Sequence, residues 1–289
     1  MKKVAKNVYY HTTTDGINVG LVVGDDAVAC IDLPIDPLEA DEWRKEIRDF
    51  AGKPIRAVIF TSSERLNSES IAIVGAPVII HDQAFAQVAT PLEPLPAMPL
   101  EPPAPMPASL RDLLSTPHWT FSEAASVALS GGKQRIFVDA VYRGGCAPEG
   151  SFVILRGQGI LFAGEHVTVG YPPLLAQGDW ARWQEVLQEL KQDSSVSLIV
   201  PGRGAPTAPG PAVDGTLEYI REALALVRSM VRAGKPRSEL ASLVPDLMAK
   251  YGPRPGKGNK LTLDLDMIGR QVRAGLETIY DSIKSGTLK

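Results

Sequence analysis

The chain has 289 residues, of which 44% are hydrophobic and 22% are charged, and its formal net charge is −3. A chain of this length and composition can bury a hydrophobic core in one large or two small domains, which excludes a disordered protein and a disulfide-stabilised miniprotein. The near balance between 30 basic and 33 acidic residues lacks the excess of positive charge that is typical of nucleic-acid-binding proteins.

The sequence also lacks the usual marks of a secreted or membrane protein. Cys30 and Cys146 are its two cysteines, too few for a disulfide framework. No apolar run reaches the ~18 residues that a membrane-spanning helix needs, and no apolar segment follows the charged N-terminus. We therefore expect a cytoplasmic protein that has neither a membrane nor a nucleic acid as its partner.

Strands are predicted through most of the first 80 residues. The turn Asp25-Asp26 separates two apolar, β-branched stretches and therefore predicts a hairpin. The stretches 55–60 and 77–80 are almost entirely apolar, as expected for strands that are covered on both faces. The segment 67–74 between them is predicted to be helical. The predicted strands cover residues 9–10, 17–23, 27–33, 55–60 and 77–80.

A helix is predicted over residues 38–50. Asp36 is a favourable N-cap, and Pro37 suits the first turn of a helix because its missing amide proton is not needed there. Trp43, Ile47 and Phe50 recur at helical spacing. These three side chains are expected to form the buried face of the helix.

Residues 91–107 differ sharply from the rest in composition, because eight of the 17 are prolines. This density disfavours both a helix and an inner strand and favours an extended path. The segment is read as an insertion that acts as a surface crossover, as a lid over a pocket or as a strap for a partner. Apolar side chains punctuate it, so we expect it to be ordered and to lie against the protein.

The alternation of strands and helices resumes after this insertion. We expect residues 1–210 to form one domain and residues 211–289 to form a helical extension packed on it. The apolar positions of the extension would either cover the first domain or form a homodimer face. Strands are predicted at 134–141, 152–155, 159–162 and 197–200, and helices at 180–192, 213–234, 238–243 and 264–284.

Local motifs at five places resemble the metallo-β-lactamase superfamily. The first is the opening hairpin, and the next two are the strands on either side of the family's first metal motif. The last two resemble the family's L-F-A-G-D and V-P-G-H-G turns. The stretches are 18–32, 53–61, 75–81, Leu161-Phe162-Ala163-Gly164-Glu165 and Val200-Pro201-Gly202-Arg203-Gly204.

This resemblance implies an α/β fold over about residues 8–210, an αββα four-layer sandwich with a C-terminal helical extension. It also implies a set of metal-ligand positions. The family motif T-H-x-H-x-D-H corresponds here to Thr61-Ser62-Ser63-Glu64-Arg65-Leu66-Asn67. The positions that would carry ligands are occupied by Ser62, Glu64, Leu66, Asn67, Ala147, Glu165 and Arg203.

None of these positions holds a histidine, so we expect no zinc cofactor. Leu66 and Ala147 cannot coordinate a metal, and the cation of Arg203 repels one. Glu64 and Glu165 are the hard ligands that remain; an ion bound there would be a hard divalent cation such as Mg²⁺ or Ca²⁺. Instead, we predict that Arg203 pairs with Glu165, within reach of Glu64 as well, and fills the position of the metal.

Other reactive groups near these positions have two interpretations each. Ser62 and Ser63 lack a G-x-S-x-G nucleophile elbow. Cys146 is either a small buried residue or a thiol that Arg143 and Arg203 activate by lowering its pKa. His166, like His11, His81 and His118, lies off the ligand positions and is expected to be structural.

Two functional hypotheses remain. In the first, the chain is a catalytically degenerate, metal-free protein of this fold that binds a small molecule or another protein. In the alternative, it is a hydrolase of an ester, lactone, thioester or amide that acts by a non-standard or single-metal mechanism, with Glu64 and Glu165 as a candidate acid–base pair. The metal content of the purified protein and a broad esterase and lactonase screen would separate them.

Overall fold

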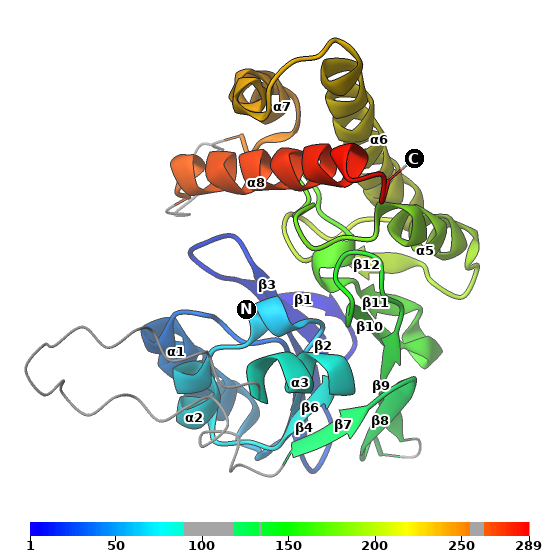
Figure 1. Ribbon diagram of the computed structural model, residues 1–289. Coiled ribbons are helices and arrows are strands. Elements are labelled where there is room, and N and C mark those ends of the chain that lie inside the picture. Colours follow the sequence, from blue (N-terminus) through cyan, green and yellow to red (C-terminus); the bar gives the residue numbers. More distant parts are fainter. Residues whose placement is uncertain (90–117, 133–134, 255–262, 289) are drawn as a thin grey trace, which may run out of the picture.

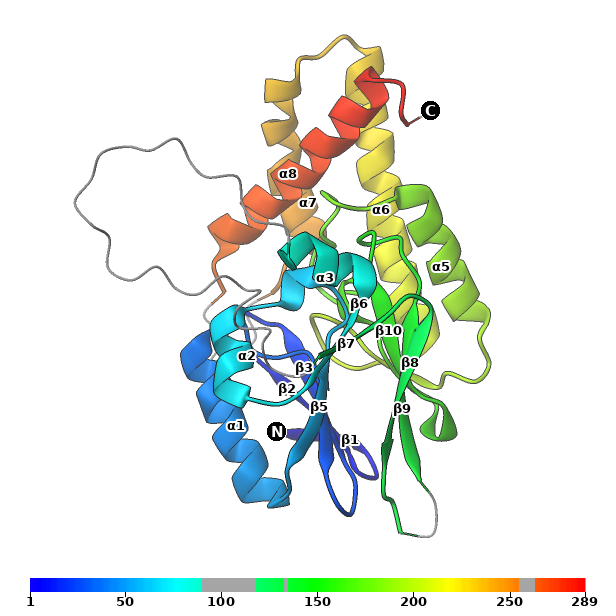
Figure 2. The same ribbon diagram turned by 60° about the horizontal axis from the view of Figure 1, so that its bottom comes forward.

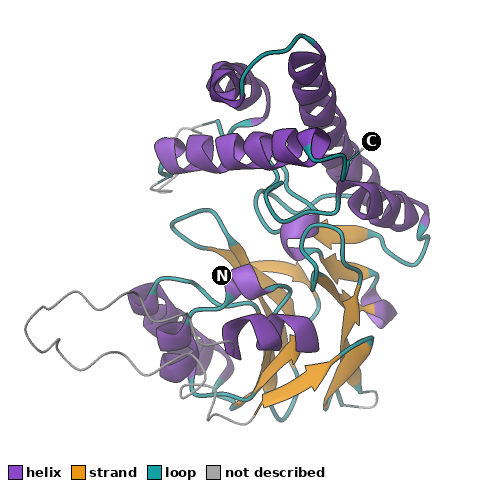
Figure 3. Cartoon of the chain, viewed as in Figure 1, coloured by secondary structure: helices purple, strands orange, loops and turns teal. Residues whose placement is uncertain are grey.

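In the computed structural model, the chain folds into two β-sheets packed face to face, with helices on both outer faces (Figures 1 and 3). The structure describes residues 1–89, 118–132, 135–254 and 263–288. The proline-rich stretch 91–107 lies outside the described residues. The predicted four-layer sandwich is confirmed.

The first sheet has seven strands in sequence order, β1 to β7. Strands β1 to β4 are antiparallel, whereas β4 to β7 run parallel. The predicted hairpin corresponds to β3 and β4. The strands are β1 (Lys2–Ala5), β2 (Val8–Thr12), β3 (Asn18–Val23), β4 (Val28–Ile31), β5 (Ile55–Ile59), β6 (Val78–His81) and β7 (His118–Phe121).

The second sheet has five strands in the order β12-β11-β10-β9-β8. Its strands β8 to β11 are antiparallel, and β12 joins β11 in parallel. The strands are β8 (Ala124–Leu129), β9 (Ile136–Tyr142), β10 (Ser151–Leu155), β11 (Ile160–Phe162) and β12 (Leu198–Val200).

Helices α1, α2 and α3 cover the outer face of the first sheet, and α5 and α6 cover the second (Figure 2). Helices α6, α7 and α8 together form the part of the molecule that projects beyond the sandwich (Figure 1). The bounds are α1 (Pro37–Ala51), α2 (Ser68–Val74), α3 (Asp82–Ala89), α5 (Trp180–Gln192), α6 (Pro209–Arg232), α7 (Val244–Tyr251) and α8 (Leu265–Lys284), with the 3₁₀ turns η1 (Ser63–Arg65), η2 (Arg156–Gln158), η3 (Gly164–His166) and η4 (Arg237–Leu243).

Three hydrophobic clusters hold the four layers together. The inner one lies between the sheets and includes Ile31 and Ile59 from the first sheet and Phe162 from the second. A second cluster packs Trp43 of α1 against the first sheet, and a third packs Trp183 of α5 against the second. Alternating side chains of each sheet thus contribute to two clusters, as expected for strands covered on both faces.

Helix α1 forms where the sequence predicts it, with one difference on its buried face. Asp36 caps it by accepting hydrogen bonds from the amides of Leu38 and Glu39 (2.8 and 3.1 Å). Trp43 and Ile47 are buried as predicted, but Phe50 is 52% exposed. Phe50 lies in the last turn of α1 and contacts the ring of Tyr9 edge-on (4.9 Å between centroids) instead of entering the core.

The C-terminal helices continue the hydrophobic core of the sandwich. Leu217 and Ile220 of α6 share one cluster with Trp183 and Leu187 of α5, and all four are almost fully buried. Because the same cluster contains Phe152 and Ile199 of the second sheet, α6 covers that sheet together with α5. The predicted helix 238–243 is the 3₁₀ turn η4, and α7 was not predicted. Within the part of the chain that the structure describes, no helix is long and apolar enough to cross a membrane.

Candidate functional site

The segments that follow β4, β5, β11 and β12 meet at one edge of the sandwich. Asp32, directly after β4, adopts a left-handed backbone conformation (φ 53°) that Asp tolerates better than most residues. Its carboxylate accepts hydrogen bonds from the amide and the hydroxyl of Thr61, both at 2.8 Å. The Ser151 amide of β10 donates to the Thr61 carbonyl (2.9 Å), which joins this segment to the second sheet.

The place where these segments meet is called the junction below. A buried ion pair between Arg65 and Glu165 lies there. Arg65 Nη2 and Glu165 Oε1 are 2.5 Å apart, and the two side chains are only 1% and 6% exposed. The same Nη2 atom lies 3.4 Å from the carbonyl oxygen of Gly202. Burial opposes the positive charge of Arg65, but the carboxylates of Glu165 and Asp32 outweigh it and raise the pKa of the guanidinium. Arg65 is therefore a permanently charged group in the interior.

The predicted pairing of Arg203 with Glu165 is wrong. Arg203 Nη1 donates instead to the backbone carbonyl of Asp15 (2.9 Å), in the loop between β2 and β3. The backbone of Arg203 forms bridges to Ile17 and Thr168, and this pairing directs its side chain to the β2–β3 loop. Arg65, one residue after Glu64, takes the role that the sequence analysis gave to Arg203.

Glu64 is half-buried next to this ion pair. Burial raises the pKa of its carboxyl to about 7, and the negative charge of Glu165 adds to the rise. Arg65 acts in the opposite direction without cancelling these effects. A carboxyl group with this pKa can exchange a proton near neutral pH, which is the property required of a general acid or base.

Glu149 is a further buried carboxylate that the sequence analysis did not single out. It is fully buried, and its Oε1 accepts hydrogen bonds from the amide (3.0 Å) and the hydroxyl (2.5 Å) of Ser63. Glu149 thus ties the loop after β9 to the loop after β5. The same signal in the sequence could have pointed to both residues. Arg65 is a charged residue inside the stretch 61–67, and Glu149 is one beside Ala147, and the family resemblance marks both stretches as ligand positions.

The remaining predicted positions serve the fold. Asn67 caps α2 by accepting a hydrogen bond from the Ser70 amide (3.0 Å). Leu66 packs against the cluster on the outer face of the first sheet, and Ala147 is buried. The side chains of Asn67 and Leu66 are thus engaged with α2 and with the outer cluster of the first sheet.

Cys146 and His166 are both buried beside the ion pair. Burial raises the pKa of the Cys146 thiol, and nearby carboxylates raise it further, so the arginine-activated thiol that the sequence suggested is not formed. Burial lowers the pKa of His166 to about 4. The neutral imidazole connects two loops, with Nε2 lying 2.7 Å from the carbonyl oxygen of Gly144 and Nδ1 3.2 Å from that of Ala163.

Several polar atoms of this junction have no hydrogen-bond partner among the described residues. They are Ser62 Oγ, Arg65 Nε, Arg65 Nη1 and Glu165 Oε2, and all are buried. Such atoms are costly, since each loses its hydrogen bond with water on folding. The junction is therefore held by charge more than by a complete hydrogen-bond network.

The residues at this junction do not fit the metal centre that the family resemblance implies. A zinc site needs imidazole, thiolate or carboxylate donors directed to one point. Glu165 is already bonded to Arg65, and the positive charge of Arg65 lies where a metal ion would need to approach. Among the described residues, no group of three or more His, Cys, Asp or Glu side chains is arranged to hold a metal.

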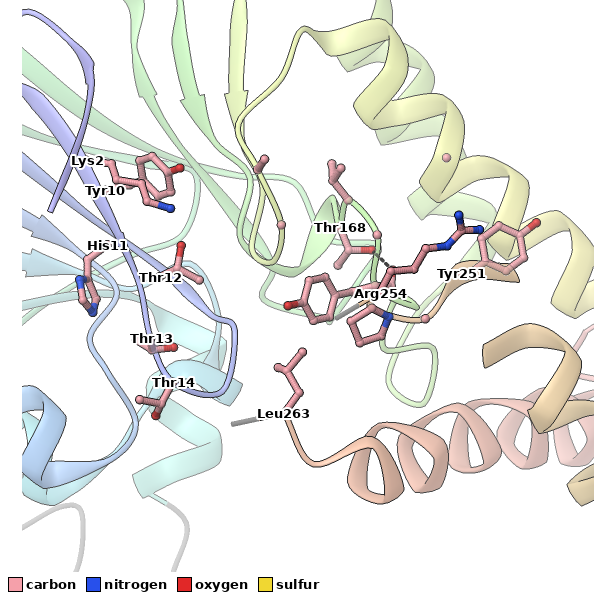
Figure 4. Close-up of a pocket in the computed structure, with 18 of the residues that line it drawn as sticks. Lys2, Tyr10, His11, Thr12, Thr13, Thr14, Thr168, Tyr251, Arg254 and Leu263 are labelled. Carbon is pink, nitrogen blue, oxygen red and sulfur yellow. Dashed lines mark hydrogen bonds between the residues drawn. The ribbon is translucent and has the colours of Figure 1, made fainter. Parts of the chain in front are cut away.

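A large groove lies beside this junction, between the sandwich and the C-terminal helices (Figure 4). Its volume is about 1270 Å³. Thr13 and Thr14 of the β2–β3 loop line the groove, and the next residue, Asp15, accepts the hydrogen bond from Arg203. A Cβ atom at Gly16 of the same loop would lie 2.9 Å from the Tyr171 hydroxyl. The lining includes Tyr10, His11, Thr12, Thr13, Thr14, Trp43, Thr168, Tyr171, Gly215, Glu218, Tyr251 and Arg254.

Comparison with known proteins finds similarity in structure alone. No family model matches the sequence, and neither does any curated protein. A metallo-β-lactamase from Pontibacter korlensis has 18% sequence identity and a TM-score of 0.59, covering 76% of this chain and 97% of its own. The DIM-1 metallo-β-lactamase has 16% identity and a TM-score of 0.57, covering 77% of this chain and 96% of its own. TMB-1 has 14% identity and a TM-score of 0.55, with the same coverage as DIM-1.

Proposed function

Starting from the metallo-β-lactamase fold of this chain, we propose that it is a metal-independent protein that binds a small molecule in the groove. The observation that carries this proposal is the Arg65–Glu165 ion pair, in which both side chains are more than nine-tenths buried. A buried cation at this position is incompatible with the metal that the fold's hydrolytic chemistry needs. The groove is open and large, and concave sites of this kind are where small ligands bind.

The charges that line the groove are largely paired with one another. The N-terminal amine of Met1 is 2.9 Å from Glu46, and Lys250 is 2.8 Å from Glu218. His11 Nε2 lies 3.6 Å from Glu39, a contact that is an ion pair only when the imidazole is protonated. Because these charges offset each other, the groove does not select strongly for an ion.

Aromatic and hydroxyl side chains make up much of the remaining lining. Trp43 borders the groove, and its Nε1 is buried with no hydrogen-bond partner among the described residues. Tyr10, Tyr171 and Tyr251 add ring surface, and three consecutive threonines add hydroxyls. This combination suits a neutral, polar small molecule that also has an apolar face.

Two glycines of α6 provide a matched test. A Cβ atom at Gly215, which lines the groove, or at Gly210 in the first turn of the same helix would meet no atom within 4 Å. Gly215→Trp should therefore fill the groove without disturbing the core, and Gly210→Trp should leave the groove open. A panel of neutral polar compounds is screened on the wild type by thermal shift, and each hit is titrated into both variants by calorimetry.

We expect hits to bind the wild type and Gly210→Trp alike and to bind Gly215→Trp at least tenfold more weakly. Hits that bind all three proteins equally would contradict the groove as the binding site. A complete lack of hits, together with co-purification of a defined protein that Gly215→Trp loses, would instead favour a protein ligand.

Glu64 supports a second candidate, a hydrolase that acts without a metal. Its pKa of about 7 and its partial exposure are suited to a general base that activates water. In that case the wild type should hydrolyse a member of an ester, lactone, thioester and amide panel, and Glu64→Gln should lower kcat by about 10²-fold or more. Turnover that is absent, or equal in Glu64→Gln, would exclude this candidate.

A further inference from the structure

The side chain of Arg203 is a buried cation without an ionic partner. It is 7% exposed, and its Nη1 donates to the backbone carbonyl of Asp15 (2.9 Å). Among the described residues this is the one hydrogen bond of its side chain, and no carboxylate forms an ion pair with it. The carboxylate of Asp15 accepts a hydrogen bond from the Thr13 hydroxyl instead. The buried Arg65, by contrast, is paired with Glu165.

Most of the hydrogen-bonding capacity of this guanidinium is unused. A guanidinium carries five N–H donors, and the bond to Asp15 uses one of them. The Nε and Nη2 atoms of Arg203 do not belong to the fully buried polar atoms without a partner, so both still reach solvent. Removing most of the water around a cation without supplying a counter-ion is costly. These donors are therefore placed to receive an anion that arrives from outside.

The hydroxyl of Tyr171 is a second donor beside the same loop. A Cβ atom at Gly16 would lie 2.9 Å from this hydroxyl, and the preceding residue, Asp15, holds Arg203. Thr168 connects the two side chains, because its backbone forms a bridge with Arg203 and its hydroxyl donates to the Tyr171 carbonyl (2.7 Å). The Tyr171 hydroxyl itself has no hydrogen-bond partner among the described residues. Burial raises its pKa, and the positive charge of Arg203 acts in the opposite direction.

We propose that Arg203 and Tyr171 form a binding site for an oxyanion, a carboxylate or phosphate group, beside the β2–β3 loop. The planar fork of an arginine suits two oxygens of one such group, and a tyrosine hydroxyl can donate to it as well. Bound there, the anion supplies the counter-charge that the chain does not give to Arg203. The proposal goes beyond the neutral ligand of the groove, because a free oxyanion needs no such ligand in order to bind.

The test is calorimetric titration of the full-length chain with inorganic phosphate and with acetate, in NaCl that keeps the ionic strength constant. We expect at least one of the two anions to bind saturably to the wild type. At tenfold its Kd, that anion should raise the melting temperature by about 2 °C or more. Tighter binding of phosphate would identify a phosphate group as the natural occupant, and tighter binding of acetate would identify a carboxylate.

Three variants assign the binding to these two side chains. Arg203→Met removes the charge but keeps an unbranched side chain, and it should weaken binding at least tenfold. Tyr171→Phe removes the hydroxyl alone and should weaken binding about twofold to tenfold. The matched control is Arg56→Met, because Arg56 forms an exposed pair with Asp26 in which the side chains are 47% and 46% exposed. This control should bind the anion as the wild type does.

Two results would overturn the proposal: no saturable binding of either anion to the wild type, or binding to Arg203→Met as tight as to the wild type. Full affinity in Tyr171→Phe would contradict the role of its hydroxyl. If Arg203→Met does not fold, Arg203→Lys takes its place, since lysine keeps the charge but lacks the planar fork. An affinity equal to that of the wild type in both Arg203→Lys and Tyr171→Phe would then overturn the proposal.

Discussion

At the scale of single residues, Glu64 combines a half-buried position with a neighbouring negative charge. Its carboxyl has a pKa of about 7 in the folded protein against an ordinary value of 4.5. Between these two pH values the folded state binds more protons at this group than the unfolded state does. The contribution of Glu64 to stability is therefore fully present below pH 4.5 and is lost as the pH rises through 7.

Glu64→Gln should remove this pH dependence. Because the glutamine carries no charge, the variant should be more stable than the wild type at pH 8 by about 1–3 kcal/mol, with solvent screening favouring the lower end. At pH 4.5 the two proteins should have nearly equal free energies of unfolding. Urea unfolding of both proteins at several pH values measures the difference, and parallel pH profiles would contradict the assignment.

The sequence places a cation at this junction but does not identify which one. Arg65 and Arg203 both lie in loops that the family resemblance singles out, and Arg203 occupies a ligand position while Arg65 does not. The choice depends on where each side chain points, which the backbone bridges of Arg203 to Ile17 and Thr168 determine. Such pairing between distant segments has no local signal in the sequence.

At the scale of elements, close contact between loops fixes the geometry of the junction. A Cβ atom on Gly202 would lie 2.3 Å from the carbonyl oxygen of Gly164 and 2.8 Å from Arg65 Nη2. Both distances are shorter than van der Waals contact allows. The loops after β11 and β12 can therefore approach this closely only with a glycine at position 202.

Gly202→Ala should separate these loops and lower the free energy of unfolding by about 1–3 kcal/mol or more. The control is Gly210→Ala, where the added methyl group meets no atom within 4 Å and the residue is helical; it should be neutral or stabilising by up to about 1 kcal/mol. Urea unfolding compares the two. Equal effects at both positions would show that the contact at Gly202 is not tight.

The elements themselves could be predicted where local chemistry decides them. The cap and proline that begin α1 and the amphipathic pattern of α5 both predicted the observed helices. Phe50 was misplaced because helical periodicity does not reveal where the supporting sheet ends. Helix α7 was missed because only eight residues form it, too few for a clear periodic pattern.

At the scale of the whole molecule, the C-terminal helices and the sandwich share a hydrophobic core. Leu217 of α6 is 2% exposed in the cluster that contains Trp183 of α5. Leu217→Ala should therefore cost about 2–5 kcal/mol and shift a single unfolding transition of the entire chain. The control is Leu38→Ala, since Leu38 is 79% exposed and its truncation should change little.

Circular dichroism and tryptophan fluorescence of Leu217→Ala should give coincident transitions. Trp43 reports on the first sheet and Trp183 on the second. An early transition in ellipticity that leaves the fluorescence unchanged would show that the helices unfold independently of the sandwich.

The metal content and metal response of the wild-type protein test the central claim most directly. Elemental analysis after purification without chelators should find far less than one equivalent of zinc or any other divalent metal, and the melting temperature should not change with added zinc or EDTA. The contradicting result would be one equivalent of bound metal that stabilises the wild type and that Glu165→Gln fails to bind. It would show that a metal ion, and not Arg65, holds this edge of the sandwich.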